Sequence, residues 1–464
     1  MSDLHELNAA MTLPECLNHT FSCSCGRTHT AALKAAVVEK DAIGKLPELL
    51  KSRGWKNVYL VCDSVTKKIA GDKARELLEV AGMDVCFHVV NHLAYDEGTL
   101  GEILIHIKED RDVVIGVGTG SINDMCRYFS FKMGLPYGII ATAAPMDGFA
   151  SSISALTVDN LKTTFEVRTP EFIIGDTEIL KNAPYSLISA GLGDLMGKFT
   201  CLCDWKLSKL INDEYYCETI VEMVDHCVRG VLENADKVKD RNPQVIGDIM
   251  EGLVFTGVAM SMIGNSRPAS GCEHHISHYF ETIFEQKGEK PAPHGHQVGV
   301  GTILILRLTE RLRKLPQVDF ERAREAAKAY DFDKWCKKIE EAYGPAAPGV
   351  IEMEKKSQKN ETTGRLKRID KMEESWQTIL ELLNELPTSR EIIHRMSELG
   401  APCFPFQIGV NREMLRNTLL YCKEIRARYT ILQMLWDLDL LEELTDQVVE
   451  EIDGILDSGA YGNP

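Results

Sequence analysis

The chain has 464 residues, of which 44% are hydrophobic and 26% are charged, and its net charge is −17. This length exceeds what one hydrophobic core usually serves, so roughly two domains are expected, each with a substantial core of its own. Nucleic acids and anionic membranes are excluded as general partners because both require clustered Lys and Arg, whereas a local basic pocket for a small anion is compatible with this charge.

The N-terminus and the cysteines point to the cytoplasm. The first ten residues are polar and lack the apolar stretch of a secretory signal. No stretch approaches the roughly 18 apolar residues that a membrane span requires. The fourteen Cys residues are scattered through apolar runs, as is typical of reduced thiols in a long cytosolic chain. We therefore expect a cytoplasmic protein with no membrane partner.

Two C-x-C pairs resemble half of a thiolate zinc site. They are Cys23 with Cys25 and Cys201 with Cys203. Neither pair is followed by a second C-x-x-C, so both match structural zinc patterns poorly. Buried or incidental thiols are the preferred interpretation.

From about residue 32 to 183, short apolar runs alternate with amphipathic stretches. The runs at 58–62, 85–90 and 113–117 are predicted strands, and helical patterns lie between them. Strands that alternate with helices predict a parallel α/β sheet, which binds nucleotides at the carboxyl ends of its strands. Residues 1–183 are therefore expected to form an α/β dinucleotide-binding domain.

From residue 184 the pattern changes to long helical periods. The segments 220–238, 244–263 and 413–441 carry apolar residues at i, i+3 and i+4. Residues 353–374 are strongly charged and poor in apolar residues, which predicts a solvated helix or a mobile connection. Residues 184–464 are therefore expected to form a mostly α-helical domain.

A glycine-containing turn follows the predicted strand at 113–117. Gly118 and Gly120 allow the backbone to approach a pyrophosphate, and the start of the next helix supplies N–H donors. Asn123 occupies the place of the third glycine in the G-x-G-x-x-G fingerprint. A tight strand-to-helix turn in any α/β protein has the same pattern, so nucleotide binding and a purely structural turn both remain open.

An Asp flanked by small residues follows the apolar run at 137–141. Asp147 lies at a strand's end, where a carboxylate can hold a substrate hydroxyl or a metal-bound water. An Asp that caps the next turn has the same pattern.

Three separate segments carry residues that hold divalent metals. One Asp and two His are a ligand set that leaves a catalytic metal with open positions for a substrate oxygen, which predicts an enzyme. Asp194 begins a helical pattern after a glycine-rich turn, so an N-cap is its alternative role. His274 and His278 are four apart and lie on one helical face, while His294 lies in a Gly/Pro-rich loop. The predicted ligands are Asp194, His274 and His294, with Glu273, His275 and His296 as further candidates.

Three cations are candidates for a substrate phosphate. They are Lys198, Arg267 and Arg168, although such residues are also commonly solvated surface charges. Only Arg267 has positional support, since it lies just upstream of the His pair.

The order of these motifs resembles the sn-glycerol-1-phosphate dehydrogenase family, most closely its bacterial branch. This family belongs to the iron-containing alcohol dehydrogenase and dehydroquinate synthase superfamily. The resemblance covers nearly the whole chain and implies an N-terminal α/β nucleotide-binding domain and an all-α C-terminal domain. The motifs that carry it lie at 118–124, 146–152, 191–198, 266–278 and 294–302.

The resemblance also implies roles for individual residues. Asp194, His274 and His294 would hold the metal. Asp147, Asp194 and His278 would face the substrate. The dinucleotide site would be lined by Gly118, Thr119, Gly120, Ser121, Ile122, Thr142, Pro145 and Ser151, with Asp63 as a ribose contact.

The chain departs from the family pattern at two cofactor-side positions. Thr119 stands where the family usually has the second of three glycines, and Pro145 replaces a Ser hydroxyl. Both bear on nucleotide affinity and on the choice between NADH and NADPH. Lys198 stands where some alcohol dehydrogenases of the superfamily carry a further His ligand, which favours a three-ligand metal.

The reaction implied is the reversible reduction of dihydroxyacetone phosphate to sn-glycerol 1-phosphate with NAD(H) or NADP(H). Arg267 would contact the substrate phosphate, and a homodimer or larger homo-oligomer is expected. The ligand set suits Zn²⁺ but also accepts Fe²⁺, Ni²⁺ or Mn²⁺. The alternatives are a glycerol or polyol dehydrogenase acting on an unphosphorylated substrate, a cyclase of the dehydroquinate or inosose synthase kind, and a non-catalytic sugar-phosphate or nucleotide sensor.

Overall fold

The structure is a computed structural model that describes residues 5–91, 96–158 and 161–459. Contacts group the chain into two compact units. The first unit is Met1–Leu195 with Glu218–Ser266, and the second is Met196–Cys217 with Arg267–Pro464. The domain boundary expected between residues 183 and 184 stays a prediction. The polar N-terminal stretch lies partly outside the described residues.

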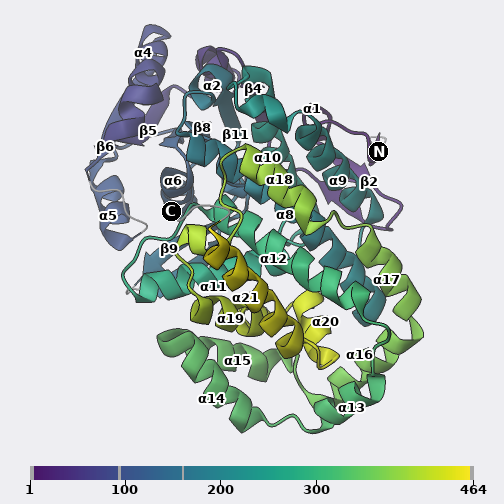
Figure 1. Ribbon diagram of the computed structural model, residues 1–464. Coiled ribbons are helices and arrows are strands. Elements are labelled where there is room, and N and C mark those ends of the chain that lie inside the picture. The colour runs from purple at the N-terminus through teal and green to yellow at the C-terminus, as the bar shows by residue number, and fades with distance from the viewer. Residues whose placement is uncertain (1–4, 92–95, 159–160, 460–464) are drawn as a thin grey trace. The chain divides into compact units, whose positions relative to one another are not determined.

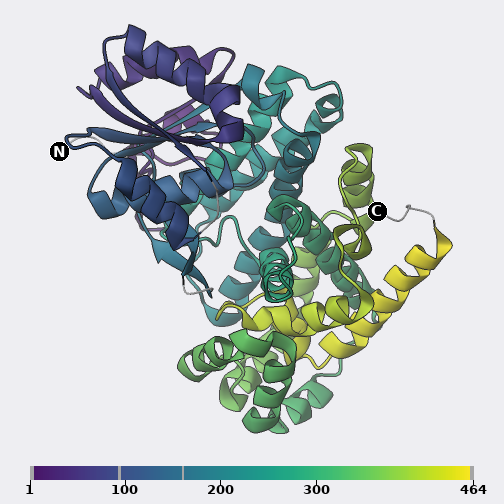
Figure 2. The same ribbon diagram turned by 90° about the vertical axis from the view of Figure 1, so that its left-hand side faces the viewer.

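A six-stranded sheet forms the centre of the first unit (Figure 2). Every pair of neighbouring strands is parallel, in the order β4-β11-β8-β7-β5-β6. The predicted parallel α/β sheet is therefore confirmed. Its strands are β4 (Ala35–Glu39), β5 (Asn57–Asp63), β6 (Asp84–Val90), β7 (Val113–Gly118), β8 (Tyr137–Ala141) and β11 (Phe172–Asp176).

The first unit also contains helices and two small sheets. The helices are α1 (Leu13–Cys16), α2 (Leu46–Lys51), α3 (Ser64–Thr66), α4 (Asp72–Val80), α5 (Glu97–His106), α6 (Gly120–Met133), α7 (Thr177–Leu180), α9 (Glu218–Glu233) and α10 (Pro243–Ile263). The small sheets are β1 (His5–Glu6), β2 (Thr20–Ser22) and β3 (Thr28–Thr30), and the antiparallel pair β9 (Ile153–Val158) and β10 (Leu161–Glu166). Helix α8 (Tyr185–Asn212) starts in the first unit and ends in the second.

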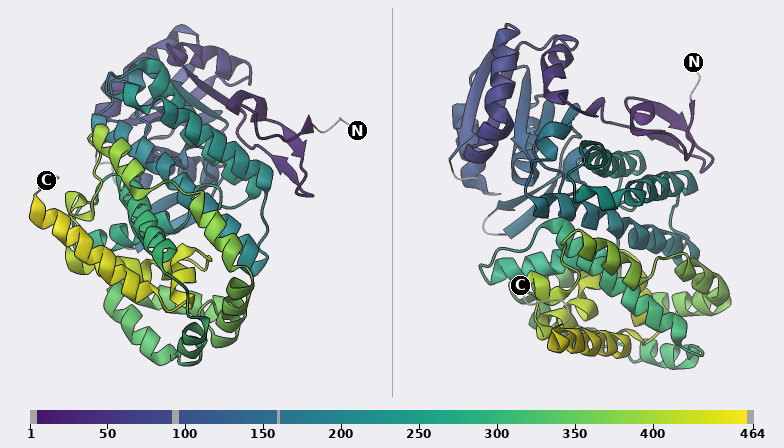
Figure 3. Two further views of the ribbon diagram at one scale, coloured as in Figure 1. Left: turned by 45° about the vertical axis from the view of Figure 1, so that its right-hand side comes forward. Right: turned by 45° about the horizontal axis from the view of Figure 1, so that its top comes forward.

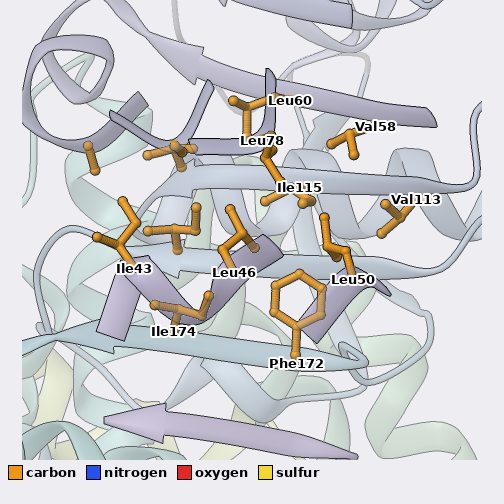
Figure 4. Close-up of a cluster of buried hydrophobic side chains, with 14 of the residues drawn as sticks. Ile43, Leu46, Leu50, Val58, Leu60, Leu78, Val113, Ile115, Phe172 and Ile174 are labelled. Atoms are coloured by element: carbon orange, nitrogen blue, oxygen red, sulfur yellow. The ribbon is translucent and has the colours of Figure 1, made fainter. Parts of the chain in front are cut away.

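The main core of the first unit lies on one face of the sheet (Figure 4). Alternate residues of β5 and β7, such as Leu60 and Ile115, point into it because successive strand side chains face opposite sides. Leu46 and Leu50 of α2 and Leu78 of α4 cover them. On the opposite face the ring of Tyr59 packs edge-on against Phe129 of α6. Both faces are buried, which accounts for the continuous apolar runs of these strands.

The strand order reverses between β5 and β7. The chain passes from β5 to β6 on one side and returns to β7 on the other, so this pair is the topological switch point, where open α/β sheets bind ligands. Cys62 pairs with Val117, so the carboxyl ends at Asp63 and Gly118 lie side by side.

The second unit is helical, as expected (Figure 1). None of its described residues belongs to a β-strand. Beyond the end of α8, its helices are α11 (Cys272–Gln286), α12 (His294–Lys314), α13 (Phe320–Lys328), α14 (Phe332–Tyr343), α15 (Ala347–Ser357), α16 (Thr362–Glu374), α17 (Trp376–Asn384), α18 (Ser389–Glu398), α19 (Arg412–Tyr421), α20 (Ile431–Asp437) and α21 (Leu441–Ser458).

One expectation for this unit is wrong, and another is incomplete. The single helix expected over 413–441 is divided between α19 and α20, and Thr430 caps the second of them. The charged segment 353–374 is not merely solvated, because Arg368 forms an ion pair with Asp437 and is nearly buried. The sequence did not reveal the break between α19 and α20, because the apolar periodicity continues through it. It did not reveal the burial of Arg368, because its partner Asp437 lies far away in sequence.

Helix α10 corrects the expectation that no segment approaches membrane-span length. It is long and apolar enough to cross a membrane by length and composition, with a mean hydropathy of 1.5. However, 72% of that apolar window is buried in the structure, as in the core helix of a soluble protein. Asn242 caps its N-terminus, and Gly264 ends it in the left-handed region at φ 78°.

Replacing Gly138 with Ala is expected to destabilise the first unit. Gly138 pairs with Phe172 in the sheet, and a Cβ atom at Gly138 would lie 2.1 Å from the ring of Phe172. Overpacking of this kind is expected to cost about 3 kcal/mol in unfolding free energy, measured by urea denaturation. The matched control is Gly101→Ala in α5, where a Cβ atom meets nothing within 4 Å. Equal denaturation midpoints for both variants would contradict this packing.

Candidate active site

Three histidines gather in the second unit where α11 and α12 begin. The ring centroids of His274 and His294 are 5.3 Å apart, and those of His278 and His294 are 5.8 Å apart. Helix α11 places His274 and His278 on one face, as their four-residue spacing predicts. His294 is the first residue of α12 and not part of a loop. The structure thus brings together imidazoles from the first two turns of α11 and from the start of α12.

The buried carboxylate of Glu273 orients His274. Its Oε1 accepts hydrogen bonds from His274 Nδ1 at 2.8 Å and from the Gly271 backbone at 2.7 Å, and its Oε2 accepts one from Thr200 at 2.6 Å. Burial opposes ionisation of this carboxyl, but these donors hold the pKa of Glu273 below its ordinary value. Because Nδ1 carries the donated hydrogen, the lone pair of His274 lies on Nε2. Glu273, a candidate ligand in the sequence, therefore positions a histidine.

Glu281 orients the other two histidines. Its Oε1 lies 3.1 Å from His294 Nδ1, and its Oε2 lies 3.2 Å from His278 Nδ1. Carboxylates that hold one ring nitrogen of a histidine are the usual partners of metal-binding imidazoles. Sequence reasoning missed Glu281, although its spacing of three residues from His278 places both on one face of α11.

Burial lowers the pKa of His278 to about 4, although Glu281 opposes this shift. The ring is therefore neutral at pH 7. With its Nδ1 hydrogen donated to Glu281, its Nε2 is an acceptor that can hold the hydrogen of a substrate hydroxyl.

Among the described residues, His275 does not share the carboxylate pairing of these three histidines. His275 is fully buried, and neither of its ring nitrogens has a hydrogen-bond partner among the described residues. Burial lowers the pKa of His296 to about 4.

The second-unit part of α8 packs closely against α11 and α12. A Cβ atom at Gly197 would lie 2.7 Å from the side chain of Val298 and 3.1 Å from that of Glu273. Lys198 is fully buried, and its Nζ donates to the Ala269 carbonyl at 3.0 Å. This close approach lets Thr200 reach Glu273.

Asp194 and Asp147 lie together in the first unit. The backbone N–H of Asp147 donates to Asp194 Oδ2 at 2.9 Å, and Asp194 is fully buried. Asp194 lies inside α8 and not at its start, so the N-cap alternative is wrong. A Cβ atom at Gly191 would lie 2.1 Å from the Ala144 carbonyl, so only glycine permits this approach between helix and loop.

The glycine turn joins β7 to α6 at the switch point. A Cβ atom at Gly118 would lie 2.8 Å from Cβ of Ile122, so the turn requires glycine there. Gly120, Ser121 and Ile122 form the first turn of α6. Thr119 directly precedes this helix, and its buried Oγ1 has no hydrogen-bond partner in the described part of the chain. An unpaired donor at a helix N-terminus is suited to an anionic group.

A buried arginine shapes the loop beside this turn. Arg127 donates to the carbonyls of Gly148, Ser151 and Ile153. Asn123, in place of the third glycine, donates to the Gly148 carbonyl at 3.3 Å. These bonds fix the segment that contains Ser151 against α6.

The other residues expected at the dinucleotide site are found at the same edge of the sheet. The Thr142 backbone N–H donates to the Gly118 carbonyl at 3.1 Å, and Pro145 is buried in the loop that follows. Asp63 caps α3, since its Oδ1 accepts from the backbones of Val65 and Thr66. Oδ2 takes no part in this cap.

The contacts of Arg267 do not support its expected role at the substrate phosphate. Its guanidinium forms a forked ion pair with Glu214 and also donates to the Tyr429 carbonyl at 3.0 Å. These three donors are directed into the protein, and Arg267 is only 2% exposed. Arg168 is exposed and stacks on Phe131, so it does not join the site either.

Comparisons with known proteins show to which family the chain belongs. A family model described as iron-containing alcohol dehydrogenase matches residues 37–184. A protein of Halalkalibacterium halodurans named glycerol-1-phosphate dehydrogenase [NAD(P)+] is 37% identical over 289 residues, which cover 61% of this chain and 72% of that protein. The chain belongs to the glycerol-1-phosphate dehydrogenase family. It is an oxidoreductase, and the resemblance stated from its motifs is confirmed.

Other members and structures extend the comparison. A glycerol-1-phosphate dehydrogenase [NAD(P)+] of Bacillus licheniformis is 28% identical, over 91% of this chain and 94% of that protein. The crystal structure of glycerol dehydrogenase from Schizosaccharomyces pombe covers 93% of this chain and 94% of its own, with a TM-score of 0.59 and 16% identity. The second likeness concerns the fold alone, and it confirms the expected iron-containing alcohol dehydrogenase-like architecture.

Replacing Arg267 with Met is expected to destabilise the second unit, because it leaves the Glu214 carboxylate without its forked partner. The expected loss of unfolding free energy is about 3 kcal/mol, measured by urea denaturation. The double variant Arg267→Met with Glu214→Gln should recover part of this loss, since both charges are then removed. Unchanged stability together with a raised KM for a phosphorylated substrate would instead restore Arg267 as a phosphate ligand.

Proposed function

We propose that this protein catalyses the reversible reduction of dihydroxyacetone phosphate to sn-glycerol 1-phosphate, with NADH or NADPH as the reductant and a divalent metal as cofactor. The observation that carries the proposal is the set of imidazoles that two buried carboxylates orient through Nδ1. Family membership supports it, because the relatives in this family are named glycerol-1-phosphate dehydrogenase [NAD(P)+].

The proposed metal ligands are Asp194, His274 and His294. The set combines one carboxylate with two imidazoles, all of which are ligand types for a catalytic divalent metal. The donor chemistry fits, because Glu273 and Glu281 each bind an Nδ1 and leave the Nε2 of their histidine for a metal. When bound, a metal supplies Lewis-acid polarisation of the substrate oxygens. Zinc is the expected ion, and nickel or iron suits the same ligands.

The dinucleotide is proposed to bind at the switch point of the sheet. Gly118 leaves room for a pyrophosphate, while the N-terminus of α6 and the unpaired hydroxyl of Thr119 supply donors. This hydroxyl offers one donor that a glycine in its place would lack. When bound, the nicotinamide supplies the hydride for C2 of the substrate. The other proposed contacts are Gly120, Ser121, Ile122, Thr142, Pro145, Ser151 and Asp63.

Asp147 and His278 are proposed to face the substrate. Reduction of the C2 carbonyl requires a hydride at carbon and a proton at oxygen. His278 is neutral, so it is proposed to hydrogen-bond the reacting oxygen through Nε2 and to relay this proton, with Glu281 holding its other nitrogen. The Asp147 carboxylate is proposed to orient a substrate hydroxyl.

We also propose that the protein is cytoplasmic and assembles as a homodimer or larger homo-oligomer. None of the fourteen cysteines, all of which lie in the described ranges, belongs to a disulfide, which agrees with a reducing compartment. Light scattering after size-exclusion chromatography tests the assembly.

Absorbance at the nicotinamide band tests the reaction directly. Metal-loaded protein is expected to oxidise NADH or NADPH with dihydroxyacetone phosphate, and a chelator should abolish this. The matched substrate is dihydroxyacetone, which lacks only the phosphate. Equal turnover of both substrates would indicate a polyol dehydrogenase. No oxidation with any divalent metal or either cofactor would indicate a cyclase or a sensor.

Replacing His274 with Ala is expected to abolish activity and to remove bound metal, since it deletes a proposed ligand. Glu273→Gln should weaken metal affinity by roughly 10- to 100-fold, because the ring of His274 loses its charged partner. The control is His394→Ala, whose side chain is 73% exposed. Metal content and rates at several metal concentrations are the measurements, and full activity of the His274 variant would refute the ligand assignment.

A further inference from the structure

The geometry of the N-terminal hairpin, which is formed by β2 and β3, points to a second metal site. The proposed reaction does not use this site. We propose that Cys23, Cys25, His29 and Cys217 bind one structural zinc ion that fastens the small sheet β1–β3 to the start of α9. Three thiolates and one imidazole are an established ligand set of structural zinc.

Three of these residues converge within the hairpin. One ligand atom from each of Cys23, Cys25 and His29 lies within 4.8 Å of the other two. Cys25 Sγ is 3.2 Å from His29 Nε2. In a tetrahedral zinc site the usual bond lengths put two sulfurs about 3.8 Å apart, and a sulfur and a nitrogen about 3.6 Å apart. The Cys25 and His29 ligand atoms therefore need to move apart by only a few tenths of an ångström to admit the ion.

His29 is held in the tautomer that zinc requires. Its Nδ1 lies 3.0 Å from the Met262 carbonyl at the end of α10, and the ring is 1% exposed. A carbonyl oxygen only accepts, so Nδ1 carries the hydrogen and the lone pair is on Nε2, the nitrogen that faces Cys25. A backbone carbonyl bound to the distal nitrogen is a recurring feature of metal-binding histidines.

A tight turn brings the two hairpin cysteines together. The Gly26 N–H donates to the Cys23 carbonyl at 3.0 Å, and Gly26 has a φ of 83°, in the left-handed region that favours glycine. The turn reverses the chain directly after Cys25 and places both thiols on the side of His29.

Cys217 is proposed as the fourth ligand because of where α9 begins. It is fully buried and directly precedes Glu218, the first residue of that helix. Two residues further on, the Thr219 hydroxyl lies 3.7 Å from Cys23 Sγ and 3.4 Å from the Ser24 hydroxyl. The hairpin therefore lies against the first turn of α9 (Figure 3). A helix N-terminus stabilises thiolates, which are the form that binds zinc.

A bound zinc ion would stabilise the hairpin. Its strands are only two or three residues long, and sheets this small are marginally stable without packing or a crosslink. Cysteine clusters of cytosolic proteins more often bind metal than form disulfides. The C-x-C spacing matched zinc patterns poorly in the sequence because the third cysteine lies far along the chain.

The test separates this ion from the proposed catalytic metal. The variant His274→Ala/His294→Ala of the full-length protein is purified and analysed for zinc by mass spectrometry. It is expected to retain one zinc per chain while its dehydrogenase activity is lost. Cobalt loaded in place of zinc should give the visible bands of tetrahedral Co²⁺ together with intense thiolate charge-transfer bands. A site of carboxylate and imidazole does not give the charge-transfer bands.

Cysteine variants in the same background assign the ligands. Cys25→Ser and Cys217→Ser are each expected to lose the thiolate bands and most of the retained zinc, while the control Cys336→Ser keeps both. If a cysteine variant does not fold, the cobalt spectrum of His274→Ala/His294→Ala, in which every cysteine is retained, still tests whether the thiolate site exists. Absence of zinc and of thiolate bands after metal loading would overturn the site. Unchanged bands in the Cys217 variant would overturn its role as the fourth ligand.

Discussion

The carboxylate of Glu273 is the interaction on which the candidate active site depends. A fully buried carboxylate is costly unless its oxygens are paired, and here Thr200, Gly271 and His274 supply the donors. The same pairing joins α8, the turn before α11 and the first imidazole of the site. Gly197 permits it because its missing side chain lets α8 approach. Because the buried charge of Glu273 requires hydrogen-bond donors, the pairing fixes the orientation of the His274 ring.

A second constraint acts at the carboxyl edge of the parallel sheet. Because β5 and β7 are neighbours at the switch point, Asp63 and Gly118 lie side by side at the carboxyl ends of these two strands. Arg127 then holds the loop from Gly148 to Ile153 against α6 with its buried guanidinium. The loop at this edge of the sheet is thus fixed by hydrogen bonds within the protein, which agrees with a preformed cofactor site.

The two units use histidine in the same manner. In the candidate active site, carboxylates bind Nδ1 of His274 and His294, and in the hairpin the Met262 carbonyl binds Nδ1 of His29. In each case the Nε2 lone pair is directed away from the orienting group. Carboxylates raise ligand basicity more than a carbonyl does. This difference agrees with a catalytic role for the first set and a structural role for the second.

The sequence by itself determined the parallel α/β class and the strands β5, β6 and β7, the helical second unit and the common face of His274 and His278, because these follow from local periodicity and spacing. It could not determine the break between α19 and α20, the partner of Arg267 or the position of Asp194 within α8. Nor did it connect Glu281 with His294. These depend on which buried charges and lone pairs meet across long sequence separations, and only tertiary packing decides that.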